Sequence, residues 1–129
     1  CDGSDNSCTW LRNPPIRPNE VESLRRLSSV ETVGERLDWS AAAKYRDVTL
    51  PGAPLEGYSA EWPAISAPEV FPGRAFTAAE ARTGARVAVL STLMVERLLG
   101  SLDPIGKTVS FNGVPFEVIG VYKDNASFL

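Results

Sequence analysis

Histidine is absent from all 129 residues of this chain, and methionine occurs only once. Without histidine the sequence has no Ser-His or Cys-His nucleophilic pair, no usual zinc ligand set and no copy of the commonest general base. An excess of basic residues is also missing, because 13 lysines and arginines stand against 16 aspartates and glutamates, giving a net charge of −3. This balance disfavours nucleic acid as a partner, since such proteins normally present a positive surface.

Long apolar runs and abundant cysteines are missing as well. No stretch reaches the 18 or so apolar residues that span a bilayer, and the start lacks the layout of a secretory signal. Cysteine occurs only as Cys1 and Cys8, in a polar segment whose close spacing suits a small disulfide loop formed outside the cytoplasm. Two separate thiols, and a lipid anchor on Cys1, are the alternatives that the residues leave open.

The composition is that of an ordinary globular domain, 43% hydrophobic and 22% charged. We divide the chain into a polar, proline-rich segment (1–18), a folded domain with room for two subdomains (19–124) and a short tail (125–129). A helix is predicted over 19–28, where Asn19 caps the start and Glu22 completes a capping box. The apolar positions of this helix recur every three residues, so one face is expected to enter the core.

Antiparallel strands are predicted after this helix. Alternating side chains favour strands over residues 32–39, 43–50 and 55–60, with the dipeptide Pro51-Gly52 as a turn. Regular structure is expected to be sparse over 61–76, where prolines recur. The larger aromatic side chains that we expect mostly in the core are Trp10, Trp39, Trp62 and Phe71, with an exposed aromatic binding groove as the alternative.

The second half has clearer signals for a mixed fold. Thr77 and Glu80 form another capping box, and Ser91 is placed to cap a helix that ends near Gly100. Between these signals, residues 86–90 form a compact apolar run typical of a buried strand. Asn112-Gly113 is the strongest short signal for a hairpin, here between strands over 108–111 and 114–121. The pattern therefore predicts the α+β class.

Motifs for chemistry are weak in this sequence. Gly106-Lys107-Thr108 resembles the end of a phosphate-binding loop, but Ser101 stands where that loop needs glycine and Thr108 opens a strand. Four acidic residues, Asp38, Glu56, Glu61 and Asp103, are read as surface charge, with a carboxylate hydrolase as an alternative. Gly73-Arg74 is expected to form a turn that holds the guanidinium against carbonyls or a carboxylate such as Asp103, with ligand binding as the alternative.

Five segments taken together are more specific than any single motif. In order and spacing they resemble the extracytoplasmic core domain of MacB-type ABC transporter permeases, in the FtsX and LolC/LolE superfamily. The segments are Gly73-Arg74-Ala75-Phe76-Thr77, Val87-Ala88-Val89-Leu90-Ser91, Leu98-Leu99-Gly100, Asp103-Pro104-Ile105-Gly106-Lys107, and Asn112-Gly113 with the strand through Gly120-Val121.

The resemblance implies a domain with a porter-like part and a second strand-rich part, inserted after the first membrane helix of a permease. It implies no catalysis, no cofactor and no metal in this domain, because the ATPase of such a transporter is a separate cytoplasmic domain or subunit. The implied role is mechanotransmission, in which ATP-driven motion crosses the membrane to export or release cargo or to act on a periplasmic partner.

The resemblance also implies partners and a location. The partners are a second permease subunit and the cytoplasmic ATPase, with a periplasmic adaptor protein or a lipoprotein cargo in some members. The location is the periplasmic or extracellular side of a bacterial cytoplasmic membrane. Because the family domain usually continues beyond its last matching strand, a piece of a longer permease is expected, with Cys1 near the outer end of a membrane helix. The alternative is a freestanding secreted or lipid-anchored binding module.

Overall fold

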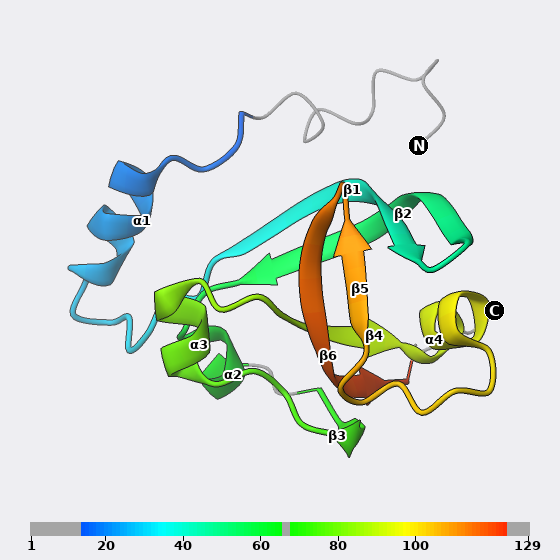
Figure 1. Cartoon of the computed structure of the whole chain (residues 1–129). Coiled ribbons are helices and arrows are strands. Elements are labelled where there is room, and N and C mark those ends of the chain that lie inside the picture. The colour runs from blue at the N-terminus through cyan, green and yellow to red at the C-terminus, as the bar shows by residue number, and fades with distance from the viewer. Residues whose placement is uncertain (1–13, 66–67, 124–129) are drawn as a thin grey trace, which may run out of the picture. The chain divides into compact units, whose positions relative to one another are not determined.

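The computed structural model describes residues 14–65 and 68–123 (Figure 1). The chain divides into two compact units, residues 1–33 and 34–129. In the described part, the first unit holds helix α1 (Pro18–Arg25), and the second holds six strands and three further helices. Cys1, Cys8 and Trp10 lie outside the described residues, so the predicted disulfide stays a prediction.

Helix α1 starts earlier than predicted. Its N-cap is Arg17 and its first helical residue is Pro18, so the predicted cap at Asn19 is wrong. Proline suits this position because its φ is already helical and the missing N–H would be unpaired there in any case. The Glu20 carboxylate accepts a hydrogen bond from the Arg17 N–H at 2.7 Å. No residue of α1 is buried, so the expected core face is also wrong, and Leu24 is exposed.

Strands β1 (Arg36–Tyr45) and β2 (Val48–Tyr58) form one long antiparallel hairpin. The predicted turn at Pro51-Gly52 is wrong, because both residues lie inside β2. They sit opposite the single residue Ala42, which makes a β-bulge with Gly52 at φ 67°. Proline is tolerated there because, among the described residues, β2 pairs only with β1 and so forms an edge of the sheet.

Strand β6 (Val114–Tyr122) is the centre of the sheet. It pairs antiparallel with β5 (Thr108–Phe111) and β3 (Val70–Gly73), and parallel with β4 (Val87–Ser91). The strand order is β2-β1-β5-β6-β3, with β4 also on β6. Asn112 and Gly113, at φ 48° and 82°, join β5 to β6, which confirms the predicted hairpin.

The helices of the second unit are α2 (Trp62–Ile65), α3 (Ala78–Thr83) and α4 (Thr92–Leu99). The two predicted helix starts in the second half are confirmed. Thr77 accepts from the Glu80 N–H, and Ser91 accepts from the Met94 N–H at 3.2 Å. These bonds satisfy N–H groups that a helix start would otherwise leave unpaired.

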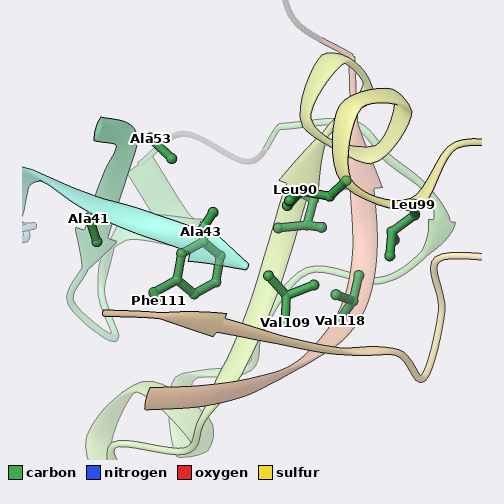
Figure 2. Packing of buried hydrophobic residues seen from close by; sticks show 9 residues of the cluster. Ala41, Ala43, Ala53, Leu90, Leu99, Val109, Phe111 and Val118 are labelled. Atoms are coloured by element: carbon green, nitrogen blue, oxygen red, sulfur yellow. The ribbon is translucent and has the colours of Figure 1, made fainter. Parts of the chain in front are cut away.

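The core lies between α4 and the sheet (Figure 2). Helix α4 contacts β1, β2, β4 and β6. Small side chains from the hairpin face larger ones from the helix and the central strands, so the two layers approach closely. The buried cluster consists of Ala41, Ala43, Ala53, Leu90, Leu98, Leu99, Val109, Phe111 and Val118.

The three described aromatic side chains that were expected in the core all lie outside this cluster, contrary to prediction. Trp39 is 50% exposed and Phe71 is 82% exposed, while Trp62 is partly buried. Trp39 belongs to the same alternating row of β1 as the buried Ala41 and Ala43. The row is buried where the core packs against it and exposed where the hairpin runs past the core.

Candidate functional site

The family-like motifs meet where β3 pairs with β6. Gly73 and Gly120 are paired across these two strands. A Cβ atom on Gly73 would overlap the carbonyl oxygen of Ile119 and would lie 2.7 Å from Cδ1 of Ile105. A Cβ on Gly120 would overlap the carbonyl oxygen of Arg74. The absence of side chains therefore allows the two backbones to touch, and it brings three separate motif segments together. We call this place the junction.

Arg74 connects the junction to helix α3. Its N–H donates to the carbonyl oxygen of Ile119 at 2.9 Å. Its guanidinium forms a bidentate pair with Glu80, with Nη1 to Oε1 at 2.7 Å and Nη2 to Oε2 at 3.1 Å. The expected clamp is present, but Asp103 as its carboxylate is wrong. Asp103 instead accepts from the N–H of Ile105, which shapes a local turn.

The Glu80 carboxylate both pairs with Arg74 and caps helix α3. Besides pairing with Arg74, it accepts a hydrogen bond from the N–H of Thr77 at 2.9 Å at the start of α3. The Arg74 hydrogen bonds first, and the Thr77 backbone second, lower the pKa of Glu80 to about 2 from 4.5. Both partners favour the ionised form, so folding and the charge of Glu80 are linked.

This linkage predicts a pH-dependent stability. Because the pKa of Glu80 is lower in the folded chain, its contribution is complete above about pH 4.5 and is lost as the pH falls toward 2. We expect the Tm of the parent chain to exceed that of Glu80→Gln at pH 7, and the difference to shrink between pH 4.5 and pH 2. Thermal unfolding followed by circular dichroism measures this. Glu96→Gln, on an exposed part of α4, is the control for removing one carboxylate. A difference that stays constant over this range would contradict the prediction.

The segment from Asp103 to Lys107 runs beside β6. The N–H of Gly106, at φ 84°, donates to the carbonyl of Val118 at 2.9 Å, and the N–H of Val118 donates to that of Lys107 at 2.8 Å. Pro104 accepts from the N–H of Lys107 at 3.2 Å, closing a turn. Thr108 then opens β5, so this lysine precedes a strand and not the helix that a phosphate-binding loop requires.

Asn112 does more than occupy its turn. Its side-chain Oδ1 accepts from the N–H of Ala42 at 2.8 Å, and its own N–H donates to the carbonyl of Ala42 at 3.0 Å. The turn between β5 and β6 is thereby tied to the bulged point of the β1–β2 hairpin, 70 residues earlier. The sequence predicted the turn but carried no signal for this long-range bond.

We expect Asn112→Gly to lower the free energy of unfolding by about 1–2 kcal/mol, because glycine keeps the positive φ but leaves the Ala42 N–H without its acceptor. Urea unfolding measures the loss, and hydrogen exchange at Ala42 locates it. Asn112→Asp keeps an acceptor oxygen and serves as the matched control. Equal stability of the glycine and aspartate variants would argue against a role for the side chain.

Phe76 belongs to a small aromatic group beside the junction. Its ring stacks on Tyr58 with 6.4 Å between centroids, and Tyr58 stacks on Trp62 at 4.8 Å. The Tyr58 hydroxyl donates to Glu56. Burial, followed by this hydrogen bond, raises the pKa of Tyr58 to about 12, so the phenol stays protonated and packs as a structural group.

The described residues offer little for catalysis. They contain no group of three or more His, Cys, Asp or Glu side chains able to hold a metal ion, and their buried side-chain polar atoms all have partners. Asp38 and Glu56 do meet, across the β1–β2 ladder, but on exposed positions where Asp38 pairs with Arg36 at 3.0 Å. None of the helices described is long and apolar enough to cross a membrane.

Comparison with known proteins gives consistent matches. The family described as the MacB-like periplasmic core domain matches residues 3–129. The macrolide export ATP-binding/permease protein MacB of Bordetella avium is 29% identical over 103 residues, which are 79% of this chain and 16% of that protein.

Two solved structures share the fold. The periplasmic region of MacB from Actinobacillus actinomycetemcomitans superposes with a TM-score of 0.73 at 25% identity, over 84% of this chain and 50% of that one. The extracellular domain of the noncanonic ABC-type transporter YknZ from Gram-positive bacteria gives 0.77 at 29% identity, over 90% and 62%. The chain thus spans 16% of the MacB protein, half of the solved MacB region and 62% of the solved YknZ domain. The α+β fold of the MacB type is confirmed, and the chain belongs to the MacB-like periplasmic core domain family.

Proposed function

We propose that this chain is the extracytoplasmic domain of an ABC transporter permease and that it transmits ATP-driven motion across the membrane without doing chemistry itself. The observation that carries the proposal is the family match over residues 3–129, together with relatives that are ABC-type transporters and an export permease. The partners that follow are a second permease subunit and a cytoplasmic ATPase. A periplasmic adaptor protein or a lipoprotein cargo would be the further partner.

The junction supports this role physically. Strand β6 pairs with β3, β4 and β5, so displacement of any of these strands acts on the same element. Gly73 and Gly120 leave no side chain between the paired backbones, so β3 lies in direct backbone contact with β6 and a displacement of one strand acts on the other. We assign to Gly73 and Arg74 the task of keeping β3 and α3 in fixed relation to β6.

The first experiment is to read the whole open reading frame around the 129 residues. Apolar helices on both sides would support the permease. A stop codon directly after Leu129, with a lipobox before Cys1, would contradict the permease proposal and support a freestanding lipid-anchored module.

The second experiment tests transmission in the full-length transporter. We expect Arg74→Ala to leave ATP hydrolysis within about twofold of the parent and to reduce export of a probe macrolide, because the bond from β3 to α3 is lost while the ATPase is untouched. Arg46→Ala, at the exposed turn of the β1–β2 hairpin, is the matched control. Unchanged export by Arg74→Ala would overturn the role of this residue.

A further inference from the structure

One half of the β1–β2 hairpin has an open edge. We call residues 36–40 with residues 54–58 the arm, which extends to one side of β5 and β6 (Figure 1). Strand β5 pairs with β1 only at Ala43 and Lys44, and Asn112 then bonds Ala42. Along 36–40, no other described strand lies on the side of β1 away from β2.

The direction of the backbone groups along this edge follows from the ladder. The N–H of Ser59 donates to the carbonyl of Glu35 at 3.0 Å, so this pair is hydrogen-bonded and every second pair after it is as well. Arg36, Asp38 and Ser40 occupy the alternate pairs, so their N–H and C=O groups point away from β2. Ala42 continues this series, and both of its backbone groups do bond outward, to Asn112.

The two edges of the arm differ. On β2, Pro54 lies opposite Ser40 and removes one donor from the outer edge, which is a common protection against strand pairing. On β1 the three outward residues keep all their donors and acceptors, and all three residues are exposed. No backbone partner for them occurs among the described residues.

The two faces of the arm also differ in chemistry. Leu37 and Trp39, 71% and 50% exposed, lie on one face. On the other face Asp38 lies directly opposite Glu56, a placement that is unfavourable for two carboxylates. Arg36 pairs with Asp38 at 3.0 Å, so Arg36, Asp38 and Glu56 together carry one excess negative charge. A cation beside Asp38 would offset that charge.

We propose that the outer edge of β1 over residues 36–40 binds an extended segment of a partner protein by strand addition. The bound segment runs antiparallel to β1, in line with β5, and has a basic side chain opposite Asp38. Its neighbours on either side are apolar and pack on the face of Leu37 and Trp39. Backbone bonds supply the attachment, and the alternation of apolar, basic and apolar residues supplies the selectivity. This peptide-binding property does not depend on the proposed transport function.

The probe is the peptide acetyl-Thr-Val-Lys-Val-Thr-amide, titrated into the ¹⁵N-labelled chain. We expect saturable shifts of the Asp38 and Ser40 amides and of the Trp39 indole, with a Kd on the order of 1 mM. Two control peptides separate the contributions. Glutamate in place of lysine should weaken binding about two- to fivefold, the size of one exposed ion pair. N-methyl-lysine, which removes the central backbone donor, should abolish the shifts.

Matched variants test the protein side. Trp39→Ala should weaken the lysine peptide about five- to tenfold, as loss of an aromatic anchor does. Phe71→Ala removes an aromatic residue that is even more exposed and lies away from the arm, and it should leave the affinity unchanged. Asp38→Asn should abolish the preference for lysine over glutamate, whereas Asp47→Asn, in the hairpin turn, should keep it. Thermal unfolding of each variant confirms that it is folded.

Three results would overturn the proposal. The first is equal affinity for the lysine and N-methyl-lysine peptides, because strand addition needs the backbone bond. The second is protection of the Asp38 and Ser40 amides from hydrogen exchange before peptide is added, because the outer edge of β1 would then already be occupied. The third is a chain that sediments as a dimer with the same amides protected, which would make a second copy the occupant.

Discussion

Gly73→Ala is expected to lower the free energy of unfolding by about 3–5 kcal/mol, combining the penalty for a positive φ with overpacking against backbone. Gly73 has φ 82°, and its added Cβ would overlap the carbonyl oxygen of Ile119 and lie 2.8 Å from Cα of Gly120. Neither neighbour is a flexible side chain, so β3 has to move off β6. Urea unfolding gives the loss, and near-ultraviolet circular dichroism reports whether the aromatic group beside the junction is disturbed.

Gly113→Ala is the matched control for this variant. Gly113 has the same φ of 82°, but nothing lies within 4 Å of its added Cβ. The control should therefore cost only about 1–2 kcal/mol, the penalty for the left-handed conformation. Equal losses of unfolding free energy for the two variants would show that the contact between β3 and β6 tolerates a methyl group. That result would contradict the role assigned to the junction.

Gly120→Ala is expected to destabilise the chain by about 3 kcal/mol, which for a unit of this size lowers Tm by at least about 12 °C. Gly120 is buried in β6, and its added Cβ would overlap the carbonyl oxygen of Arg74 and lie 3.0 Å from the carbonyl carbon. The N–H of Arg74 is hydrogen-bonded to the carbonyl of Ile119, so the Arg74 backbone cannot move away from the added methyl group without losing this bond. Differential scanning calorimetry measures the shift.

Gly57→Ala provides the comparison for a strand glycine with a yielding neighbour. Its added Cβ would meet only the ring of Trp39, at 3.0 Å, and that ring is half exposed. We expect a change within about 1 kcal/mol, because the tryptophan can shift and alanine loses less backbone entropy than glycine. A loss at Gly57 as large as at Gly120 would mean that clash with the backbone is not what makes the junction sensitive.

Both glycine predictions also bear on the proposed function. The junction holds β3 against β6 through backbone contact at Gly73 and Gly120, so movement of β3 acts directly on the backbone of β6. A variant that stays folded but loosens the pairing of β3 with β6 is therefore expected to weaken export more than ATP hydrolysis in the full-length transporter. Arg74→Ala is the milder form of the same change, because it removes the salt bridge to Glu80 and leaves the backbone contact between β3 and β6 in place.

Interactions between residues close in sequence were sufficient to predict several helices and turns. Ser91 and Thr77 cap helices with side-chain oxygens that act within three residues, and Asn112-Gly113 turns a hairpin because both positions accept positive φ. These features depend on neighbours in sequence, so the sequence predicts them well. The cap of α1 failed because two local signals competed there, and Pro18 at the first helical position outweighed Asn19.

Features that depend on distant neighbours were predicted less well. Pro51-Gly52 has the composition of a turn, but it forms a bulge because β2 lies at an edge where a missing N–H costs no ladder bond. The sequence predicted Asp103 as the carboxylate that pairs with Arg74, but the structure shows Glu80 in that place. Glu80 was missed because the sequence had already assigned it to the cap of α3. The predicted strands over 32–39 and 43–50 were wrong in their bounds, because β1 runs unbroken over Arg36–Tyr45 and the turn follows at Arg46 and Asp47. The alternation of side chains along β1 was correct, but only the packing of the core decides which end of the strand is buried.

By itself the sequence determined the α+β class, the second-half elements and, through the order of its motifs, membership of the MacB-like family. These depend on residue types and spacings within a few residues, which are set by the sequence whatever the rest of the chain does. Only the tertiary structure decided that Gly73 and Gly120 touch, that Asn112 ties the last hairpin to Ala42, and that one edge of the arm is open. Each of these depends on which strands become neighbours, and that is a property of the packed sheet and not of any segment in it.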